Sequence, residues 1–323
     1  MNEKDLITSP HLLQYSATTD IEKARTFSRT INPRSRREEY FEPVDEDRHD
    51  DVHWGQRKLL LSEMEFITKE IDKMDTSKPM TILYVGAAEG NHIYLMAKKL
   101  FPQFEYHLYD KRDFYPKLYE LENIKIFKRY FDNNDAKRYK DKNLLFICDI
   151  RGLDIGKAKQ KRNFETMNTI VLDDMKMQEE WYKIMKPKSA LLKFRLPWFP
   201  GKTRYLDGTI YFQVWQKLHS AESRLIPNGE TKYYDHTAYE QRMFYFNRHT
   251  RRKFYKHPYK FYGHCYDCKS ETVILEEFLK KFRPEIKKDK FDYELCKLGR
   301  TITESLSKTK RLFPEGPLSV FEI

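Results

Sequence analysis

The chain has 323 residues, of which 40% are hydrophobic and 15% aromatic, with only 11 glycines and 14 prolines. This composition excludes a collagen-like or low-complexity protein, and it predicts a packed body with one main core or two small ones. The formal net charge of +11 suits a polyanionic partner, although an excess of lysine can equally coat a solvated surface.

The first segments of the chain are polar. Residues 1–37 predict a peripheral arm, and they contain no apolar stretch typical of a secretion signal. An acidic segment over 38–51, which holds Tyr40 and Phe41, predicts a loop. Over 56–74 the apolar residues recur mostly at helical spacing, so we expect an amphipathic helix that enters the main domain.

Strand-like and helical segments alternate after residue 80. The expected strands are 81–85, 105–109, 124–130 and 144–150, and the helix expected between the first two is 92–100. Strands that alternate with helices predict βαβ units, and therefore a mostly parallel sheet covered by helices on both faces.

The second half continues this pattern with less regular spacing. The expected elements are a helix over 164–185, a strand over 189–196, weaker strands over 209–214 and 221–226, a helix over 236–252 and two helical stretches within 271–306. We expect 253–268 to be irregular. The domains we predict are an arm (1–37), a main domain (38–262) and a helical extension (263–323).

Features of the whole chain predict a soluble, intracellular protein. No apolar run approaches the roughly 20 residues that a membrane helix needs. The four cysteines do not suggest a disulfide framework. Cys265-Tyr-Asp-Cys268 beside His264 resembles half of a zinc site, but no second pair of ligands stands at suitable spacing, so we expect no metal.

A short glycine loop, Gly86-Ala-Ala-Glu-Gly90, follows the strand 81–85. Turns of this kind bring backbone N–H groups against a ligand. Ala88 replaces the middle glycine of the dinucleotide pattern, which disfavours a pyrophosphate and favours S-adenosylmethionine, a cofactor without phosphate. Asp110 ends the next strand, where a carboxylate can accept hydrogen bonds from adenosyl ribose hydroxyls. A structural glycine turn with a surface aspartate is the alternative.

Two charged residues stand at positions typical of a catalytic site. Asp149 ends the fourth strand, at the carboxyl edge where α/β sheets place ligands. Lys193 lies in an apolar strand, where an ammonium group is costly. Burial and a neighbouring cation such as Lys58 each lower a lysine pKa, so that the amine can accept a proton from a hydroxyl. A lysine whose stem extends to solvent is the alternative.

Five short motifs follow one another along the chain. They are Gly55-Gln-Arg-Lys-Leu-Leu-Leu61, Val85-Gly-Ala-Ala-Glu-Gly90, Cys148-Asp-Ile-Arg151, Leu192-Lys-Phe-Arg-Leu-Pro197 and Ser220-Ala-Glu-Ser-Arg-Leu225. In this order they resemble the poxvirus cap-specific 2′-O-methyltransferases, a family that also serves as the small regulatory subunit of the poly(A) polymerase. The resemblance covers roughly residues 40–250.

This resemblance implies a Rossmann-like, S-adenosylmethionine-dependent methyltransferase that modifies the ribose 2′-OH of capped mRNA. It carries a catalytic tetrad onto Lys58, Asp149, Lys193 and Glu222, with Lys193 as the general base. Asp149 and Lys58 would hold the hydroxyl, and Glu222 would orient Lys58 or the ribose. The implied cofactor contacts are Gly86, Ala88, Gly90, His92, Asp110, Arg112, Phe131 and Asp149.

Recognition of the cap calls for aromatic rings and carboxylates, because 7-methylguanine carries a delocalised positive charge. The resemblance implies Trp198 and Glu240 for one ring and one acid, and either Tyr40 or Phe41 for a second ring. Cations also alternate with aromatic residues over 242–260, an arrangement that suits phosphates and unpaired bases. If that segment is helical, however, many of its rings belong to a core face.

The implied partners are capped mRNA and a poly(A) polymerase catalytic subunit, without a membrane. The implied location is the cytoplasm, in the viral factory or virion of a large DNA virus. Two other functions stay open from the sequence: a non-catalytic, RNA-binding polymerase subunit, and a 2′-O-methyltransferase of internal rRNA or tRNA positions.

Overall fold

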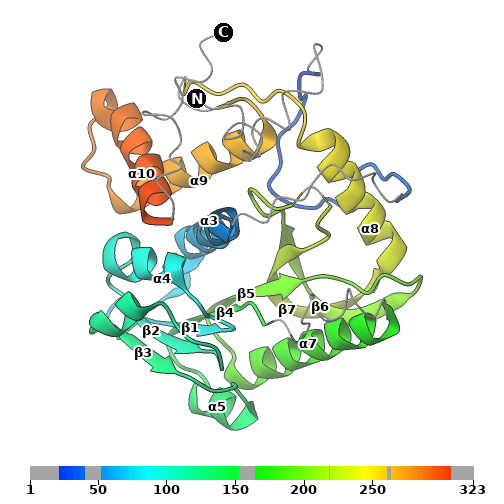
Figure 1. The fold of residues 1–323 in the computed structure, drawn as a ribbon, viewed down its shortest axis with the longest axis horizontal. Coiled ribbons are helices and arrows are strands. Elements are labelled where there is room, and N and C mark those ends of the chain that lie inside the picture. The colour runs from blue at the N-terminus through cyan, green and yellow to red at the C-terminus, as the bar shows by residue number, and fades with distance from the viewer. Residues whose placement is uncertain are drawn as a thin grey trace.

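The computed structural model describes residues 22–40, 52–150, 152, 164–217, 219–259 and 263–306. Its strands are β1 (Thr81–Val85), β2 (Glu105–Tyr109), β3 (Ile124–Phe127), β4 (Leu144–Cys148), β5 (Ser189–Phe194), β6 (Lys202–Tyr211) and β7 (Ser223–Asp235). Its helices are α3 (Val52–Glu70), α4 (Asn91–Leu95), α5 (Asn133–Arg138), α7 (Phe164–Met185), α8 (His236–Tyr245), α9 (Tyr266–Phe282) and α10 (Phe291–Leu306). Figure 1 shows helices on both faces of the sheet.

The seven strands form one sheet in the order β3-β2-β1-β4-β5-β7-β6. The first five strands run parallel, and β7 runs antiparallel to both β5 and β6. The strand order reverses between β1 and β4, and doubly wound sheets bind their ligands beside such a reversal. The structure therefore confirms the predicted α/β fold with a mostly parallel sheet.

Alternation along β1 divides the interior into two core layers. Ile82 and Tyr84 pack with residues of α3, α4, α9 and α10 on one face. Leu83 and Val85 pack with residues of α7 and α8 on the other. Successive side chains of a strand point to opposite faces, so a strand with a helical layer on each side is apolar throughout, which is how its sequence reads.

Several elements differ from their predicted bounds. The short strands expected over 209–214 and 221–226 are instead parts of the long β6–β7 hairpin, whose exposed residues are polar and hide its β pattern. The expected strands 124–130, 144–150 and 189–196 end earlier, at Phe127, Cys148 and Phe194. Helix α5 was not predicted; Asp132 caps its N-terminus through the backbone N–H groups of the first turn.

The C-terminal helices belong to the same interior as the sheet. Helix α9 begins within a stretch that we expected to be irregular, and it packs against α3. Helix α10 packs against α3, α4 and α9, and Leu295 and Ile302 are fully buried in the core layer that includes β1. The domain division at residue 263 stays a prediction. None of the helices that the structure describes is both long and apolar enough to cross a membrane.

Candidate active site

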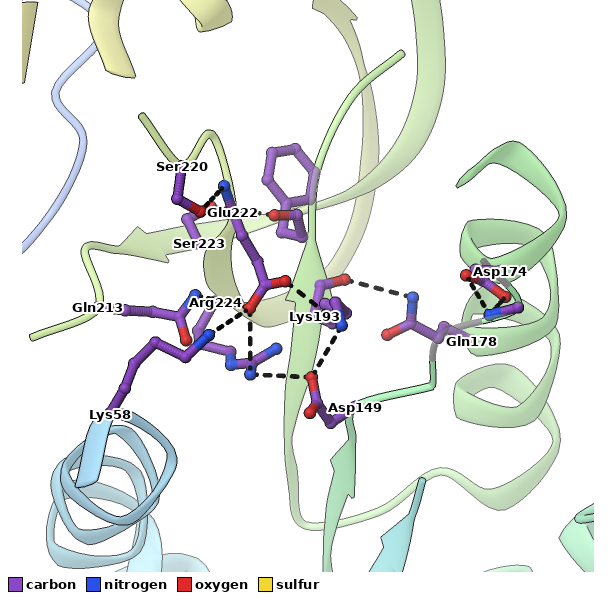
Figure 2. Close-up of polar contacts among 12 residues, drawn as sticks. Lys58, Asp149, Asp174, Gln178, Lys193, Gln213, Ser220, Glu222, Ser223 and Arg224 are labelled. Atoms are coloured by element: carbon purple, nitrogen blue, oxygen red, sulfur yellow. Dashed lines mark hydrogen bonds and ion pairs between the residues drawn. The ribbon is translucent and has the colours of Figure 1, made fainter. Parts of the chain in front are cut away.

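The four tetrad residues meet at the carboxyl edge of β4 and β5 (Figure 2). Lys193 Nζ lies 3.2 Å from Asp149 Oδ1 and 3.3 Å from Glu222 Oε2. Lys58 Nζ, from α3, donates a hydrogen bond to Glu222 Oε1 at 3.0 Å. Strand register explains the meeting, because Cys148 pairs with Leu192 across β4 and β5, so the residue after each stands at the same level of the edge.

Sequence reasoning missed two members of this cluster. Arg224 is 3% exposed; its NH2 lies 2.9 Å from Asp149 Oδ1 and 3.6 Å from Glu222 Oε1. Gln213 donates from Nε2 to Glu222 Oε1 at 3.0 Å. A signal for Arg224 was available, because it stands two positions after Glu222 and pairs with Lys193 across β5 and β7. The chain offers no comparable signal for Gln213.

Charge and burial shape the electrostatics of the cluster. The side chains of Lys58, Asp149, Lys193 and Glu222 are between 11% and 17% exposed. Burial opposes ionisation of Asp149, but Arg224 and Lys193 lower its pKa to about 2. Burial lowers the pKa of Lys58, although Glu222 acts against this effect. Burial also acts against the charge of Arg224, but Asp149 and Glu222 raise its pKa above the usual value.

The glycine loop lies against this cluster. Gly86 has a φ of +83°, and a Cβ atom there would lie 2.7 Å from the backbone carbon of Asp149. Gly90 has a φ of +79° and precedes the first residue of α4. Glycine is thus required at Gly86 for two reasons, its left-handed backbone and the close approach of β4. The loop and the residue after β4 must move together.

Asp110 closes the other side of the loop. Its Oδ2 accepts a hydrogen bond from the backbone N–H of Ala88 at 3.1 Å and pairs with Arg112 NH2 at 2.9 Å. Arg112 also donates to the carbonyl of Ala88 at 2.7 Å. Burial opposes ionisation of Asp110, but the hydrogen bonds from Arg112 lower its pKa. The carboxylate therefore stays charged at the end of β2, beside the loop.

Two predicted cofactor contacts have packing roles in the structure. The ring of His92 is buried, 2.8 Å from Gln56 Oε1 and 3.1 Å from Glu63 Oε1, so it joins α4 to α3. Phe131 is 6% exposed, and its ring meets those of Tyr109 and Trp181 at 4.9 and 5.0 Å. These contacts place both side chains in the interior, and their part in cofactor binding stays a prediction.

Three predicted cap residues are connected through their neighbours. The guanidinium of Arg195 stacks on the ring of Trp198 at 3.5 Å. Burial raises the pKa of Glu240, and Arg195 acts against that rise. Tyr40 is 45% exposed and packs its ring against Phe244, one turn after Glu240 on α8. Phe41 lies outside the described residues.

The basic and aromatic stretch 242–260 buries most of its described rings. Arg251 is fully buried and pairs with Asp267 at 2.8 Å, so it cannot contact RNA in this structure. Phe244 in α8 and Phe246 in the helical turn that follows are buried. Lys256 is exposed. The expectation that a helix would turn its rings toward the core is confirmed.

The Cys265 and Cys268 sulfurs are 3.4 Å apart and buried at the start of α9. No group of three or more histidine, cysteine, aspartate or glutamate side chains suited to a metal ion occurs among the residues described.

Comparisons with known proteins agree with these observations. A family described as "Poly A polymerase regulatory subunit" matches residues 28–296. The cap-specific mRNA (nucleoside-2′-O-)-methyltransferase of Fowlpox virus (strain NVSL) is 29% identical over 66% of this chain and 73% of its own length. The protein of that name from Myxoma virus (strain Lausanne) is 27% identical over 61% of each chain, so the match spans less than two thirds of that relative.

A solved structure of bluetongue virus VP4, described as an RNA-capping production line, matches 74% of this chain and 41% of its own. The TM-score is 0.38 and the identity 14%, values too low to support any statement about function.

Proposed function

Because the chain belongs to the poly(A) polymerase regulatory subunit family, we propose that it methylates the ribose 2′-OH of capped mRNA with S-adenosylmethionine as methyl donor. The observation that carries the proposal is the position of Lys193. Its Nζ lies between a carboxylate oxygen of Asp149 and one of Glu222, at the ligand-binding edge of the sheet.

The residues around the glycine loop fit an adenosyl cofactor. Gly86 leaves no room for a side chain where the loop meets β4, so backbone lines this part of the edge. Asp110 holds a charged carboxylate at the end of β2, as ribose hydroxyls require. Backbone of Gly86 to Gly90 and the carboxylate of Asp110 would hold the cofactor, which supplies an electrophilic methyl group when bound.

The buried cluster can hold and deprotonate a hydroxyl. Lys193 Nζ is buried and, within the described part of the chain, makes no hydrogen bond, although two carboxylates lie within 3.3 Å. A buried donor of this kind requires an explanation; in this proposal its partner is the substrate 2′-OH. The amine accepts the hydroxyl proton, and the oxygen is left free to attack the methyl carbon.

Charge balance favours a proton acceptor within the cluster. Among the described residues, Lys58, Lys193 and Arg224 pair with two carboxylates, those of Asp149 and Glu222, so the fully protonated cluster carries one excess positive charge. This excess charge favours the release of one proton. Arg224 keeps its proton, because both carboxylates raise its pKa, and this supports a lysine as the base.

Lys193 is assigned as the base because its Nζ lies at the ligand-binding edge and makes no hydrogen bond with the described residues, whereas Lys58 already donates to Glu222. The lysine with the lowered pKa is nevertheless Lys58. Comparison of Lys193→Met with Lys58→Met distinguishes the two. Loss of the base should abolish the chemical step at every pH, and loss of the positioning lysine should leave a slow reaction with an altered pH dependence.

Cap binding is proposed at Trp198 and Glu240. Stacking would use the ring of Trp198, on which Arg195 packs at 3.5 Å. The half-buried carboxylate of Glu240 would accept hydrogen bonds from the guanine edge. Tyr40 packs on α8 near Glu240 and is exposed enough to contribute a second ring.

The decisive experiment measures transfer of labelled methyl from S-adenosylmethionine to matched RNAs with and without a 7-methylguanosine cap. Cap-dependent labelling that is lost in Lys193→Met supports the proposal. Equal labelling of both RNAs would point to methylation of internal positions. No labelling by the wild-type protein would leave a non-catalytic RNA-binding subunit.

A second role as a polymerase subunit follows from the family description alone. We propose that the chain also binds a poly(A) polymerase catalytic subunit in the cytoplasm of infected cells, the setting suggested by its viral relatives. Co-purification with that subunit and longer poly(A) tails in its presence would support this role. Unchanged tail length would contradict it.

A further inference from the structure

The carboxylate of Glu271 on α9 joins the two chain segments that hold Glu222 in the catalytic cluster. We propose that Glu271 is a positioning residue for methyl transfer, which acts through α3 and through the segment 212–217. The inference rests on the proposed function, because it concerns the same reaction.

Glu271 is completely buried and binds both segments directly. Arg57 of α3 donates from Nε to Glu271 Oε2 at 3.0 Å, and its NH2 pairs with Oε1. Trp215, in the segment after β6, donates from Nε1 to Oε2 at 2.6 Å. A guanidinium that pairs with both oxygens fixes the plane of the carboxylate, so the position of the indole is tied to that of α3.

The same two segments meet again at the catalytic cluster (Figure 2). Lys58 follows Arg57 directly, and Gln213 stands two residues before Trp215. Lys58 Nζ and Gln213 Nε2 both donate to Glu222 Oε1, each at 3.0 Å. The two segments are thus joined at two places. Glu271 binds both of them away from the reacting atoms, and Glu222 binds both of them within the cluster.

The backbone of Trp215 shows that its segment is held under constraint. Its φ is +60°, a left-handed conformation that a bulky side chain rarely adopts. Asp267, one turn before Glu271 on α9, accepts a hydrogen bond from the Trp215 backbone N–H at 3.0 Å. Such a conformation persists only where surrounding contacts impose it, and these are typical of functional sites. Here the hydrogen bonds from the Trp215 backbone and from its indole both go to carboxylates of α9.

Loss of the Glu271 charge should therefore change the contacts of Glu222. The buried guanidinium of Arg57 would lack its counter-ion, and the indole would lack its acceptor, so both segments could shift. Glu222 raises the pKa of Lys58 against the effect of burial. A looser contact between them would lower the pKa of Lys58 further.

Glu271→Gln tests this role, because the amide keeps the shape of the side chain and removes its charge. We expect kcat to fall by about 10-fold or more, with smaller changes in KM for methyl donor and capped RNA. The decrease in kcat that follows loss of the Lys58 proton should occur at lower pH than in the wild type. If Glu271 had only a structural role, its substitution would change neither kcat relative to KM nor the pH dependence of kcat.

Asp135→Asn is the matched control. Asp135 is 1% exposed, lies on α5, and accepts a hydrogen bond from Arg129 NH2 at 2.6 Å. This variant should lose stability in urea unfolding and keep wild-type kcat. If Glu271→Gln does not fold, Trp215→Phe removes the indole donor and keeps an aromatic ring, and it should lower kcat with the same pH shift.

Each outcome bears on the inference. Wild-type kcat and pH profile in folded Glu271→Gln, or in Trp215→Phe where that variant is needed, would overturn it. An equal fall in kcat for Asp135→Asn would also overturn it, because the cause would then be general destabilisation. A wild-type protein without methyl transfer would overturn the proposed function and this inference together, whereas an active wild type with an unaffected variant overturns the inference alone.

Discussion

Replacement of Gly86 by alanine should separate the glycine loop from the residue after β4. The new Cβ atom would lie 2.7 Å from the backbone carbon of Asp149, 2.8 Å from its oxygen and 2.8 Å from the nitrogen of Ile150. All three are backbone atoms of one neighbouring chain segment, so no side chain can rotate away. Either the loop or the end of β4 must shift, and Asp149 shifts with it.

Other glycines of positive φ allow the loss of stability to be divided into a backbone contribution and a steric contribution. Gly229 has a φ of +95° and no atom within 4 Å of its added Cβ, so Gly229→Ala should cost only the left-handed backbone, about 1–2 kcal/mol. Gly90→Ala adds contacts of 3.0–3.3 Å, two of them with flexible side-chain ends. Gly86→Ala adds the overlap with β4, at roughly 1–3 kcal/mol beyond the backbone cost.

Urea unfolding and calorimetric titration with S-adenosylhomocysteine measure the two effects separately. The loss of stability should increase from Gly229→Ala through Gly90→Ala to Gly86→Ala. Only the last should also lose methyl transfer when the cofactor is saturating, because it displaces Asp149. Stability and transfer rate in Gly86→Ala no worse than in Gly229→Ala would refute the argument from close approach.

Three further substitutions test the cluster and the cap residues. The pKa of Asp149 is about 2, below the ordinary aspartate value, so its contribution to stability is present above about pH 4 and is lost as pH falls toward 2. The unfolding free energy of Asp149→Asn should therefore depend less on pH in that window, and identical pH slopes would contradict the assignment. Arg224→Lys keeps the charge but not the planar group near both carboxylates, so single-turnover methyl transfer should slow by about 10-fold; a wild-type rate would count against it. Trp198→Ala should raise KM for capped RNA by roughly 5- to 100-fold with little effect on uncapped RNA, whereas Tyr293→Ala, an exposed ring on α10, should change neither. Equal effects of Trp198→Ala on both RNAs would argue against cap stacking.

The predictable parts of the fold are those whose pattern is local. β1, β2 and α7 have the predicted bounds, because each is an apolar run or a helical repeat that ends at a clear break. The length of the β6–β7 hairpin was underestimated, because its strands carry exposed charged residues such as Lys202 and Asp235 at paired positions. Its stability depends on pairing between distant residues, for which a short window contains no signal.

The same distinction applies to the site. Asp149 and Lys193 could be located from sequence because adjacent parallel strands end at one edge, and the structure brings them within 3.2 Å. Lys58 and Glu222 rested on the order of motifs, and they join the same cluster. Arg224 was overlooked inside a motif already recognised. Glu271 could not be found, because the role of a buried glutamate in a helix depends on its partners, and these stand 214 and 56 positions away.

The residues just before Lys58 in its motif have structural roles that the chemistry of Lys58 does not explain. Successive residues of a helix point about 100° apart, and three consecutive side chains of α3 reach different parts of the molecule. Gln56 contacts His92 at the start of α4, Arg57 pairs with Glu271 of α9, and Lys58 binds Glu222. Only the third contact touches the proposed catalytic cluster. The first two contacts fix the rotation of α3 about its axis and its position along that axis. Lys58 reaches Glu222 through a flexible side chain. The position of α3 therefore decides whether the ammonium group of Lys58 stays with Glu222 or turns toward the solvent.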